Sequence, residues 1–301
     1  MKTCFMIVGA LLLAGCTPKK NAGPLIDIAT YKLEIESWHQ KRLHELQGHN
    51  GWLNVAGLFW LKEGINTFGS GRDNDIVFPE GRIAERAGTF MLKQGVVTAD
   101  IPNGVLITSR GKVVDHLMVF NPDSTRNPTL SFDSLQWFII KRDTKYGVRL
   151  RDLDSEELKT FSGIERFEVD PAFRLTATFE KTENRTIPIT NILGQTTAQP
   201  SPGTLVFNLD DKEYRIDAID EGGEDLFIIF GDATNTKETY GAGRYLYVKR
   251  PDASGSTVID FNKAYNPPCA FTAFATCPIP PKQNVLPIPV QAGEKNYDLH
   301  N

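Results

Sequence analysis

The strongest constraint on the fold is a series of short β-prone runs that begins after Trp52 and continues almost to the C-terminus. These runs are rich in Val, Ile, Phe and Tyr, and Gly, Asn, Asp or Pro separate them; examples are GVVTADI (95–101), LQWFIIKR (135–142), DLFIIFG (225–231) and STVIDFN (256–262). A spacing of roughly ten residues between turns is typical of antiparallel sandwiches and barrels, and not of a parallel sheet covered by helices. We therefore predict a mainly β protein with an antiparallel β-sandwich or barrel body.

One segment ahead of these runs has a helical period instead. Residues 25–50 carry apolar side chains near a 3.6-residue repeat, namely Ile28, Tyr31, Ile35, Trp38, Leu43 and Leu46. Gly48 and Asn50 follow the last of them and are suited to end a helix. The pattern predicts one N-terminal helix that packs Trp38 and its neighbours onto the body.

The first residues have the features of an export signal. Lys2 precedes an apolar run from Cys4 to Leu13, and small residues lead to Cys16. About ten apolar residues make a helix of only about 15 Å, whereas a bilayer core needs about 30 Å. Leu-Ala-Gly-Cys at 13–16 resembles the bacterial lipobox, which implies a lipoprotein signal peptide at 1–15. The alternative is a plain secretory peptide cleaved nearby.

The resemblance to the lipobox also implies a cellular location. Cleavage before Cys16 and lipidation of its sulfur would anchor the chain to a lipid bilayer, with residues 16–24 as a lipidated, polar tether. We expect a protein of the bacterial cell envelope, on the periplasm-facing side of the outer membrane.

The body is long enough for one large or two smaller domains. We predict a β-sandwich-like region at 51–165 and a second β region at 166–301, because the acidic, turn-rich stretch 151–163 separates two groups of strands. The two groups could equally share one core. The formal net charge of −4 offers no basic face, so nucleic acid is not an expected partner.

Only two cysteines remain in the predicted mature body, Cys269 and Cys277, inside a proline-rich strap, AYNPPCAFTAFATCPIPP (264–281). Prolines exclude a regular helix there, so we expect an extended segment on the surface or along a sheet edge. In an oxidising compartment the two thiols are expected to form a disulfide. A reduced buried pair, or metal or redox chemistry, are the alternatives.

Several short motifs superficially suggest enzymes. The histidines of HELQGH, His44 and His49, are five apart, which turns them about 140° from one another on a helix instead of placing them on one face. FGSGR (68–72) lacks the spacing of a nucleophile elbow, and GAGRYL (241–246) lacks the third glycine of a dinucleotide loop. We expect no metal site and no cofactor.

Residues 64–79 have a local resemblance to the opening of forkhead-associated domains. A strand, a glycine turn, Arg72 and Asp75 precede a second short strand. The resemblance implies a similar sandwich topology. The serine and histidine that would support phosphopeptide recognition are missing from the following RIAERAGTF (82–90), so Arg72 and Asp75 are better interpreted as parts of a turn held by side-chain hydrogen bonds.

A run of basic residues follows in IIKRDTKYGVRLRDLDSEE (139–157). Alternation along a strand places Arg149 and Arg151 on one face and Val148 and Leu150 on the other. We expect the arginines to form a solvated face that is balanced by nearby aspartates, Asp152 and Asp154.

The densest polar residues lie in the second half of the chain. The candidate ligand-binding residues are Asp232, Tyr240, Arg244, Asp260, Asn262, Tyr265 and Asn266. An arginine fork after a glycine turn is suited to grip a carboxylate or phosphate, and equally to clamp backbone carbonyls. We predict a polar pocket at Arg244 if these segments meet on one rim.

Four stretches also resemble one bacterial family, the domain of unknown function 1684. They are residues 51–79, 141–152, 225–248 and 260–295, and together they extend over nearly all of the predicted mature chain. The resemblance implies one fold and carries over no catalytic residue.

We therefore expect a membrane-anchored binding or scaffold protein whose pocket accepts a small anionic ligand, a glycan or a protein partner. The alternative is a hydrolase that uses Asp and Tyr side chains for acid and base chemistry, with Arg244 stabilising negative charge. Binding is the preferred interpretation, because no nucleophile with a histidine base can be assembled.

Overall fold

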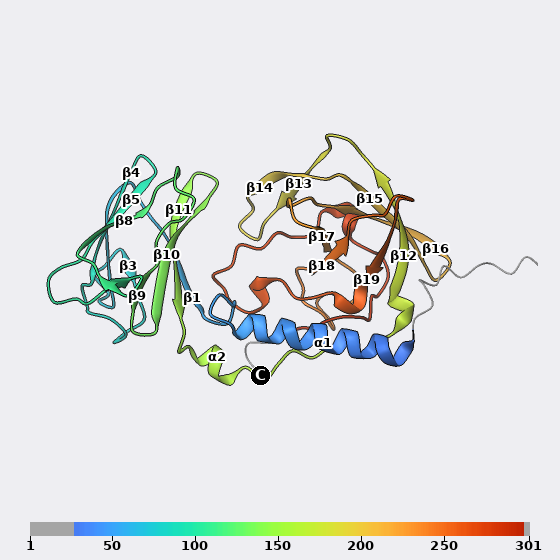
Figure 1. The fold of residues 1–301 in the computed structure, drawn as a ribbon, viewed down its shortest axis with the longest axis horizontal. Coiled ribbons are helices and arrows are strands. Elements are labelled where there is room, and N and C mark those ends of the chain that lie inside the picture. The colour runs from blue at the N-terminus through green and yellow to red at the C-terminus, as the bar shows by residue number, and fades with distance from the viewer. Residues whose placement is uncertain (1–26, 298–301) are drawn as a thin grey trace, which may run out of the picture.

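The computed structural model describes residues 27–297, so the predicted signal peptide, the tether and Cys16 lie outside the described residues. The described chain is mainly β, as predicted, with nearly all strand pairs antiparallel. Figure 1 shows two groups of strands side by side, with the long helix beneath the C-terminal group. None of the helices between residues 27 and 297 combines the length and the apolar character needed to cross a membrane.

Two facing sheets form the first group. One sheet has the order β1-β11-β10-β9-β6-β7 and the other β3-β2-β4-β5-β8. Their strands are β1 (Val55–Trp60), β2 (Gly64–Gly69), β3 (Ile76–Val77), β4 (Gly88–Lys93), β5 (Val96–Asp100), β6 (Thr108–Ser109), β7 (Lys112–Val113), β8 (His116–Phe120), β9 (Leu130–Phe132), β10 (Leu135–Arg142) and β11 (Lys145–Asp152). Only β2 and β3 pair in parallel among the ladders described.

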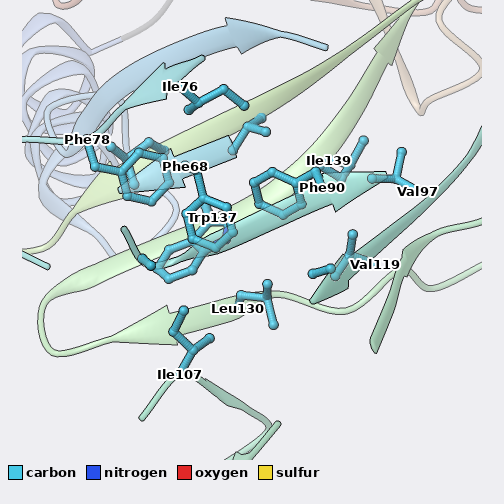
Figure 2. Packing of buried hydrophobic residues seen from close by; sticks show 14 of the residues in the cluster. Phe68, Ile76, Phe78, Phe90, Val97, Ile107, Val119, Leu130, Trp137 and Ile139 are labelled. Atoms are coloured by element: carbon cyan, nitrogen blue, oxygen red, sulfur yellow. The ribbon is translucent and has the colours of Figure 1, made fainter. Parts of the chain in front are cut away.

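Aromatic rings fill the space between these two sheets. Phe68 stacks on Phe90 with ring centroids 4.4 Å apart, and Phe78 meets the edge of Trp137 at 5.2 Å. Figure 2 shows these rings pointing toward one another between strands of both sheets. Because each ring buries a large apolar area, this cluster supplies much of the stability of the first β region.

The second group surrounds a separate core. A four-stranded sheet, β16-β15-β12-β19, and the β17-β18 pair both contribute to it, while the β13-β14 hairpin extends from its side. The strands are β12 (Arg174–Lys181), β13 (Thr186–Thr190), β14 (Thr196–Pro200), β15 (Gly203–Leu209), β16 (Lys212–Ala218), β17 (Asp225–Phe230), β18 (Arg244–Lys249) and β19 (Ser256–Asp260).

The predicted N-terminal helix is α1 (Ile28–Gln47). Asp27 caps it by accepting the Thr30 N–H at 2.9 Å. On the buried face of α1, the residue that follows Ile35 is His39. Trp38, which was expected to pack onto the body, is only half-buried.

A five-residue helix, α2 (Glu156–Thr160), follows β11. Four 3-10 turns complete the described chain: η1 (Pro171–Phe173), η2 (Phe261–Lys263), η3 (Pro268–Ala270) and η4 (Lys282–Asn284).

The strap at 264–281 does not lie on the surface along its whole length. Ala270, Phe271 and Ala275 are buried, and Thr272 donates its hydroxyl to the carbonyl of Val55 in β1 at 3.0 Å. Near its start, Tyr265 pairs with Tyr245 at the edge of β18, as expected of a proline-rich segment. The strap therefore lies between the two β regions and contacts both.

The core of the first β region provides a direct test of this packing. Phe68 and Ile65 share strand β2, but Phe68 is fully buried and Ile65 is 63% exposed. We expect Phe68→Ala to lower the free energy of unfolding by about 3–5 kcal/mol, because it leaves a cavity in an aromatic cluster. Ile65→Ala is the matched control, and its cost should stay below about 1 kcal/mol. Urea denaturation measures both, and equal losses would contradict the packing described.

Candidate functional site

Arg244 lies at the start of β18 and has no exposed surface. Its Nη2 donates to Asp232 Oδ2 at 2.9 Å and to the carbonyl of Val290 at 2.8 Å, and its Nη1 donates to the carbonyl of Ala292. These partners occupy both terminal nitrogens of the guanidinium, while its Nε has no hydrogen-bond partner in the described chain, and they hold the C-terminal segment onto the core. The polar pocket predicted at Arg244 is therefore not open in the structure, because the side chain clamps backbone carbonyls instead.

Asp232 is equally enclosed. Its Oδ1 accepts the N–H of Thr234 at 2.9 Å, the Thr234 hydroxyl at 2.6 Å and the N–H of Val290 at 3.1 Å. A carboxylate with these donors and a buried arginine has no free lone pair directed at solvent. Asp232 is thus placed to shape its loop, and it is not placed to exchange protons with a substrate.

Asp260 and Asn262 attach α1 to the second β region. Tyr31 of α1 donates its hydroxyl to Asp260 Oδ1 at 2.8 Å, and Asn262 donates its side-chain amide to the carbonyl of Asp170 at 2.9 Å. Burial raises the pKa of the Asp260 carboxyl, and the hydrogen bond from Tyr31 opposes that rise. Both candidates therefore have structural partners inside the molecule.

Tyr265 and Asn266 form a second attachment of the same helix. Arg42 of α1 lies over the ring of Tyr265, 4.7 Å from its centroid, and donates to the carbonyl of Asn266 at 3.0 Å. Asn266 donates its own N–H to the buried Glu294 carboxylate at 2.7 Å. Tyr240, the remaining candidate, is half-buried against the apolar cluster around Phe271.

The structure does bring the two candidate segments together. Tyr245 and Tyr265 exchange both backbone hydrogen bonds at 2.9 Å, so residues 240–244 and 260–266 are neighbours. Their polar side chains, however, point into separate internal contacts. The sequence identified a real cluster of segments, and its role in this structure is to connect the helix, the strap and the second core.

The disulfide predicted between Cys269 and Cys277 is absent, because the structure has both residues as free thiols. The two are close nevertheless. The N–H of Cys269 donates to the sulfur of Cys277 at 3.0 Å, and the N–H of Cys277 donates to the sulfur of Cys269 at 3.3 Å. The reduced pair, one of the alternatives, is the state described here.

The expected solvated face of Arg149 and Arg151 is wrong. β11 lies between β1 and β10, and both of its faces are covered, so these arginines are only 4% and 8% exposed. Arg151 donates to the carbonyl of Gly51 and to the side chain of Asn54. Arg149 lies over the ring of Trp52 instead, at 5.5 Å from its centroid.

A cavity opens where the β13-β14 hairpin, the strap and the β10-β11 turn meet. Its volume is about 390 Å³. The lining residues come from distant parts of the chain: Arg142, Asp143, Ile189, Asn191, Gln195, Thr196, Thr197, Gln199, Ile219, Glu221, Phe227, Ile229, Thr276 and Pro278. We name this space the junction cavity. Its size is within the usual range for sites that bind small molecules.

Local hydrogen bonds shape one wall of the junction cavity. At the tip of the hairpin, Asn191 Oδ1 accepts the N–H groups of Leu193 at 2.9 Å and Gln195 at 3.1 Å, which closes the turn. The hydroxyls of Thr190 and Thr196 hydrogen-bond to each other at 2.8 Å across the two strands. The strap continues this wall, because the N–H of Ile279 donates to the carbonyl of Thr190 at 2.8 Å.

The lining combines an apolar base with polar groups around it. Ile219, Phe227 and Ile229 are buried members of one hydrophobic cluster, whereas the hairpin contributes amides and hydroxyls. The charged lining residues are one arginine, Arg142, and two acidic residues, Asp143 and Glu221, so the site has no strong positive charge. Such a surface suits hydrogen bonding to a small polar molecule with an apolar face.

Sequence reasoning missed this cavity. The stretch TNILGQTTAQP (190–200) is dense in amides and hydroxyls, which is the signal that could have identified the cavity, but the rest of the lining, apart from Ile189, comes from three separate segments, residues 142–143, 219–229 and 276–278. Elsewhere, Asp75 accepts both the N–H and the hydroxyl of Thr67, at 3.0 and 3.1 Å, as expected of a locked turn. Between residues 27 and 297 no cluster of three His, Cys, Asp or Glu side chains is placed to hold a metal ion.

Comparisons with known proteins give a family and no activity. Residues 159–295 match the family described as "Protein of unknown function (DUF1684)". An uncharacterized protein from Haloarcula marismortui, solved by solution NMR, is 32% identical over 48% of this chain and 82% of that chain, with a TM-score of 0.40. An FHA domain studied for phosphothreonine-dependent interactions aligns with 14% identity over 31% of this chain and 92% of that chain, with a TM-score of 0.22. No curated protein matches the chain.

The structural role of Arg244 can be tested against that of an exposed arginine. Arg244→Met leaves the buried Asp232 carboxylate without its cation, so we expect the free energy of unfolding to fall by about 3–5 kcal/mol. Arg72→Met is the control, because Arg72 has only an exposed contact of 3.9 Å to Glu80 and should change stability by less than about 0.5 kcal/mol. Denaturant unfolding measures both changes. A fully stable Arg244→Met variant would contradict the clamp.

Proposed function

We propose that this chain, which belongs to the DUF1684 family of proteins of unknown function, is a binding protein whose ligand occupies the junction cavity. The observation that carries this proposal is the lining of the cavity, with six amide or hydroxyl side chains around an apolar base. The proposed ligand is a small neutral molecule that carries several hydroxyl groups, such as a mono- or disaccharide.

The chemistry of the lining supports this ligand class. Gln and Asn side chains carry both donors and acceptors, and adjacent hydroxyls of a sugar need both. Part of this capacity is used within the hairpin, where Asn191 donates to Gln195 Oε1 at 2.9 Å and Gln199 donates to the Thr197 hydroxyl at 3.0 Å. Phe227, Ile219 and Ile229 offer an apolar surface for the C–H face of a sugar ring. An anionic ligand is less well matched, because Asp143 and Glu221 line the same space as Arg142.

The hydrolase alternative has weaker support. The groups proposed for acid and base chemistry are Asp232, Asp260, Tyr240 and Tyr265, with Arg244 for charge stabilisation. Asp232, Asp260 and Arg244 are buried and hydrogen-bonded within the protein, Arg42 covers the ring of Tyr265, and Tyr240 packs half-buried against an apolar cluster. A catalytic acid or base must come within hydrogen-bond reach of the substrate. Binding is therefore the function that we propose.

The proposal also includes a location, supported by the sequence of residues 1–24. A lipid on Cys16 would hold the binding protein at a bacterial cell envelope, on the periplasm-facing side of the outer membrane. The tether would leave the body close to that surface. Metabolic labelling with a fatty-acid analogue, with Cys16→Ser as the control, tests this anchor.

Thermal shift against a panel of neutral sugars and sugar acids tests the ligand class. A neutral sugar at about 100 times its Kd should stabilise the protein by about 2.7 kcal/mol. Gln199→Ala removes one lining amide and should weaken that sugar about tenfold, since about 1.4 kcal/mol corresponds to a factor of ten. Asn208→Ala is the matched control, because Asn208 is exposed on β15 and outside the cavity.

Arg142→Gln separates a neutral from an anionic ligand. For a neutral sugar we expect its Kd to change by less than about threefold, whereas loss of a charged hydrogen bond would cost about 1.5–3 kcal/mol. Isothermal titration of the same ligand with both proteins measures the difference. Binding of a sugar acid that depends on Arg142, together with no binding of neutral sugars, would contradict the proposed ligand class.

A further inference from the structure

The pair formed by Cys269 and Cys277 has an asymmetric environment. Cys277 is buried at 6% exposed, whereas Cys269 is only partly buried, so reagents reach Cys269 more easily. Each sulfur accepts the backbone N–H of the other cysteine, at 3.0 and 3.3 Å. The strap therefore holds the two thiols face to face while they remain unbonded.

Arg149 adds a charge near these thiols: it lies over the ring of Trp52, which packs against the same apolar cluster as both cysteines, and it interacts electrostatically with both sulfurs. Arg149 is only 4% exposed, and no carboxylate between residues 27 and 297 forms an ion pair with it. Its Nε also has no hydrogen-bond partner in the described chain. Burying a cation without an anion is costly, so this position favours a negative charge nearby.

We propose that Cys269 and Cys277 form a reversible dithiol–disulfide couple, in which Cys269 is the attacking thiolate, Arg149 is the positioning residue that stabilises it, and Cys277 is the resolving thiol. The inference does not depend on the proposed sugar binding. It differs from a permanent crosslink, because both thiols are accommodated in the folded structure.

The electrostatics of the site agree with these roles. The hydrogen bond from Cys277 lowers the pKa of the Cys269 thiol, and Arg149 lowers it further. The same hydrogen bond and burial raise the pKa of Cys277. Burial lowers the pKa of Arg149 to about 10, which leaves it charged at neutral pH. The charges of Arg142 and Arg151 also lower the pKa of Arg149. Burial raises the pKa values of Tyr240 and Tyr245, which interact electrostatically with both cysteines.

The reaction partner is a low-molecular-weight disulfide. The Cys269 thiolate attacks one of its sulfurs, the external S–S bond breaks, and one thiolate leaves and takes a proton from solvent. Cys277 then loses its proton to solvent and attacks the Cys269 sulfur, which releases the second thiol. The two cysteines lose two electrons and two protons, and these reduce the external disulfide to two thiols.

The test equilibrates the full chain in buffers of oxidised and reduced glutathione, followed by acid quench, maleimide labelling and mass spectrometry. Trypsin releases residues 264–282 as one peptide that carries both cysteines and neither Cys4 nor Cys16. We expect this peptide to change reversibly from two labelled thiols to an internal disulfide. A peptide that stays oxidised in excess reduced glutathione, or reduced in excess oxidised glutathione, would overturn the proposal.

Two serine variants test the assigned roles. Cys277→Ser removes the resolving thiol, so glutathione should accumulate as a mixed disulfide on Cys269. Cys269→Ser should form little adduct on the buried Cys277. Equal adducts on both variants, or adducts only on Cys277, would overturn the assignment.

A charge variant tests Arg149. Arg149→Gln should slow the reaction of Cys269 with oxidised glutathione about tenfold at pH 7, if the thiol pKa rises by about one unit. The midpoint of its rate against pH should move to higher pH, because the thiolate exists only above that pKa. Arg149→Lys should restore most of the rate, and Arg72→Gln, a change on an exposed turn, should have no effect. An unchanged pH profile in Arg149→Gln would remove Arg149 from the couple.

Discussion

The second half of the molecule depends on the buried ion pair of Arg244 and Asp232. Neither side chain has contact with solvent, and Arg244 also holds carbonyls of the segment at 290–292. A buried pair is costly to assemble, and removing one partner leaves the other charge unmatched. The pair therefore fixes the path of the C-terminal chain more than it adds net stability. Because that chain continues to Glu294, which accepts from Asn266 and Arg42, the same constraint extends to the strap and α1.

The strap turns this local constraint into a connection between the two β regions. Its start is held at the edge of β18, its middle donates to β1, and its end pairs with β13. Prolines suit such a path, since they fix the backbone without requiring donors. The junction cavity and the cysteine pair share this segment: Thr276 and Pro278, on either side of Cys277, line the cavity.

The sequence was sufficient for the architecture and for the family, and insufficient for the site. Period-two runs and turn residues predicted the strands, and a 3.6-residue period predicted α1, because both patterns are local. Burial of Arg149 and Arg151 depends on β11 being central and covered on both faces, which alternation along one strand does not reveal. Arg244 was identified as a candidate, but the carbonyls that it clamps lie almost fifty residues further along the chain. The N–H donors of a guanidinium that suit a ligand phosphate suit backbone carbonyls equally well.

Function is best sought where the two β regions meet, around the junction cavity and the strap. In the second β region, Asp232 and the two terminal nitrogens of Arg244 have their partners within the protein, whereas Arg244 Nε, Ser201 Oγ and Asn266 Oδ1 have no hydrogen-bond partner in the described chain. Arg149, by contrast, is a buried cation without a carboxylate partner in the described chain, and the hairpin amides at 191–199 line an open space. Unsatisfied groups raise the free energy of a fold and are retained at functional positions. Both Arg149 and the hairpin amides lie beside the strap, where the two β regions meet.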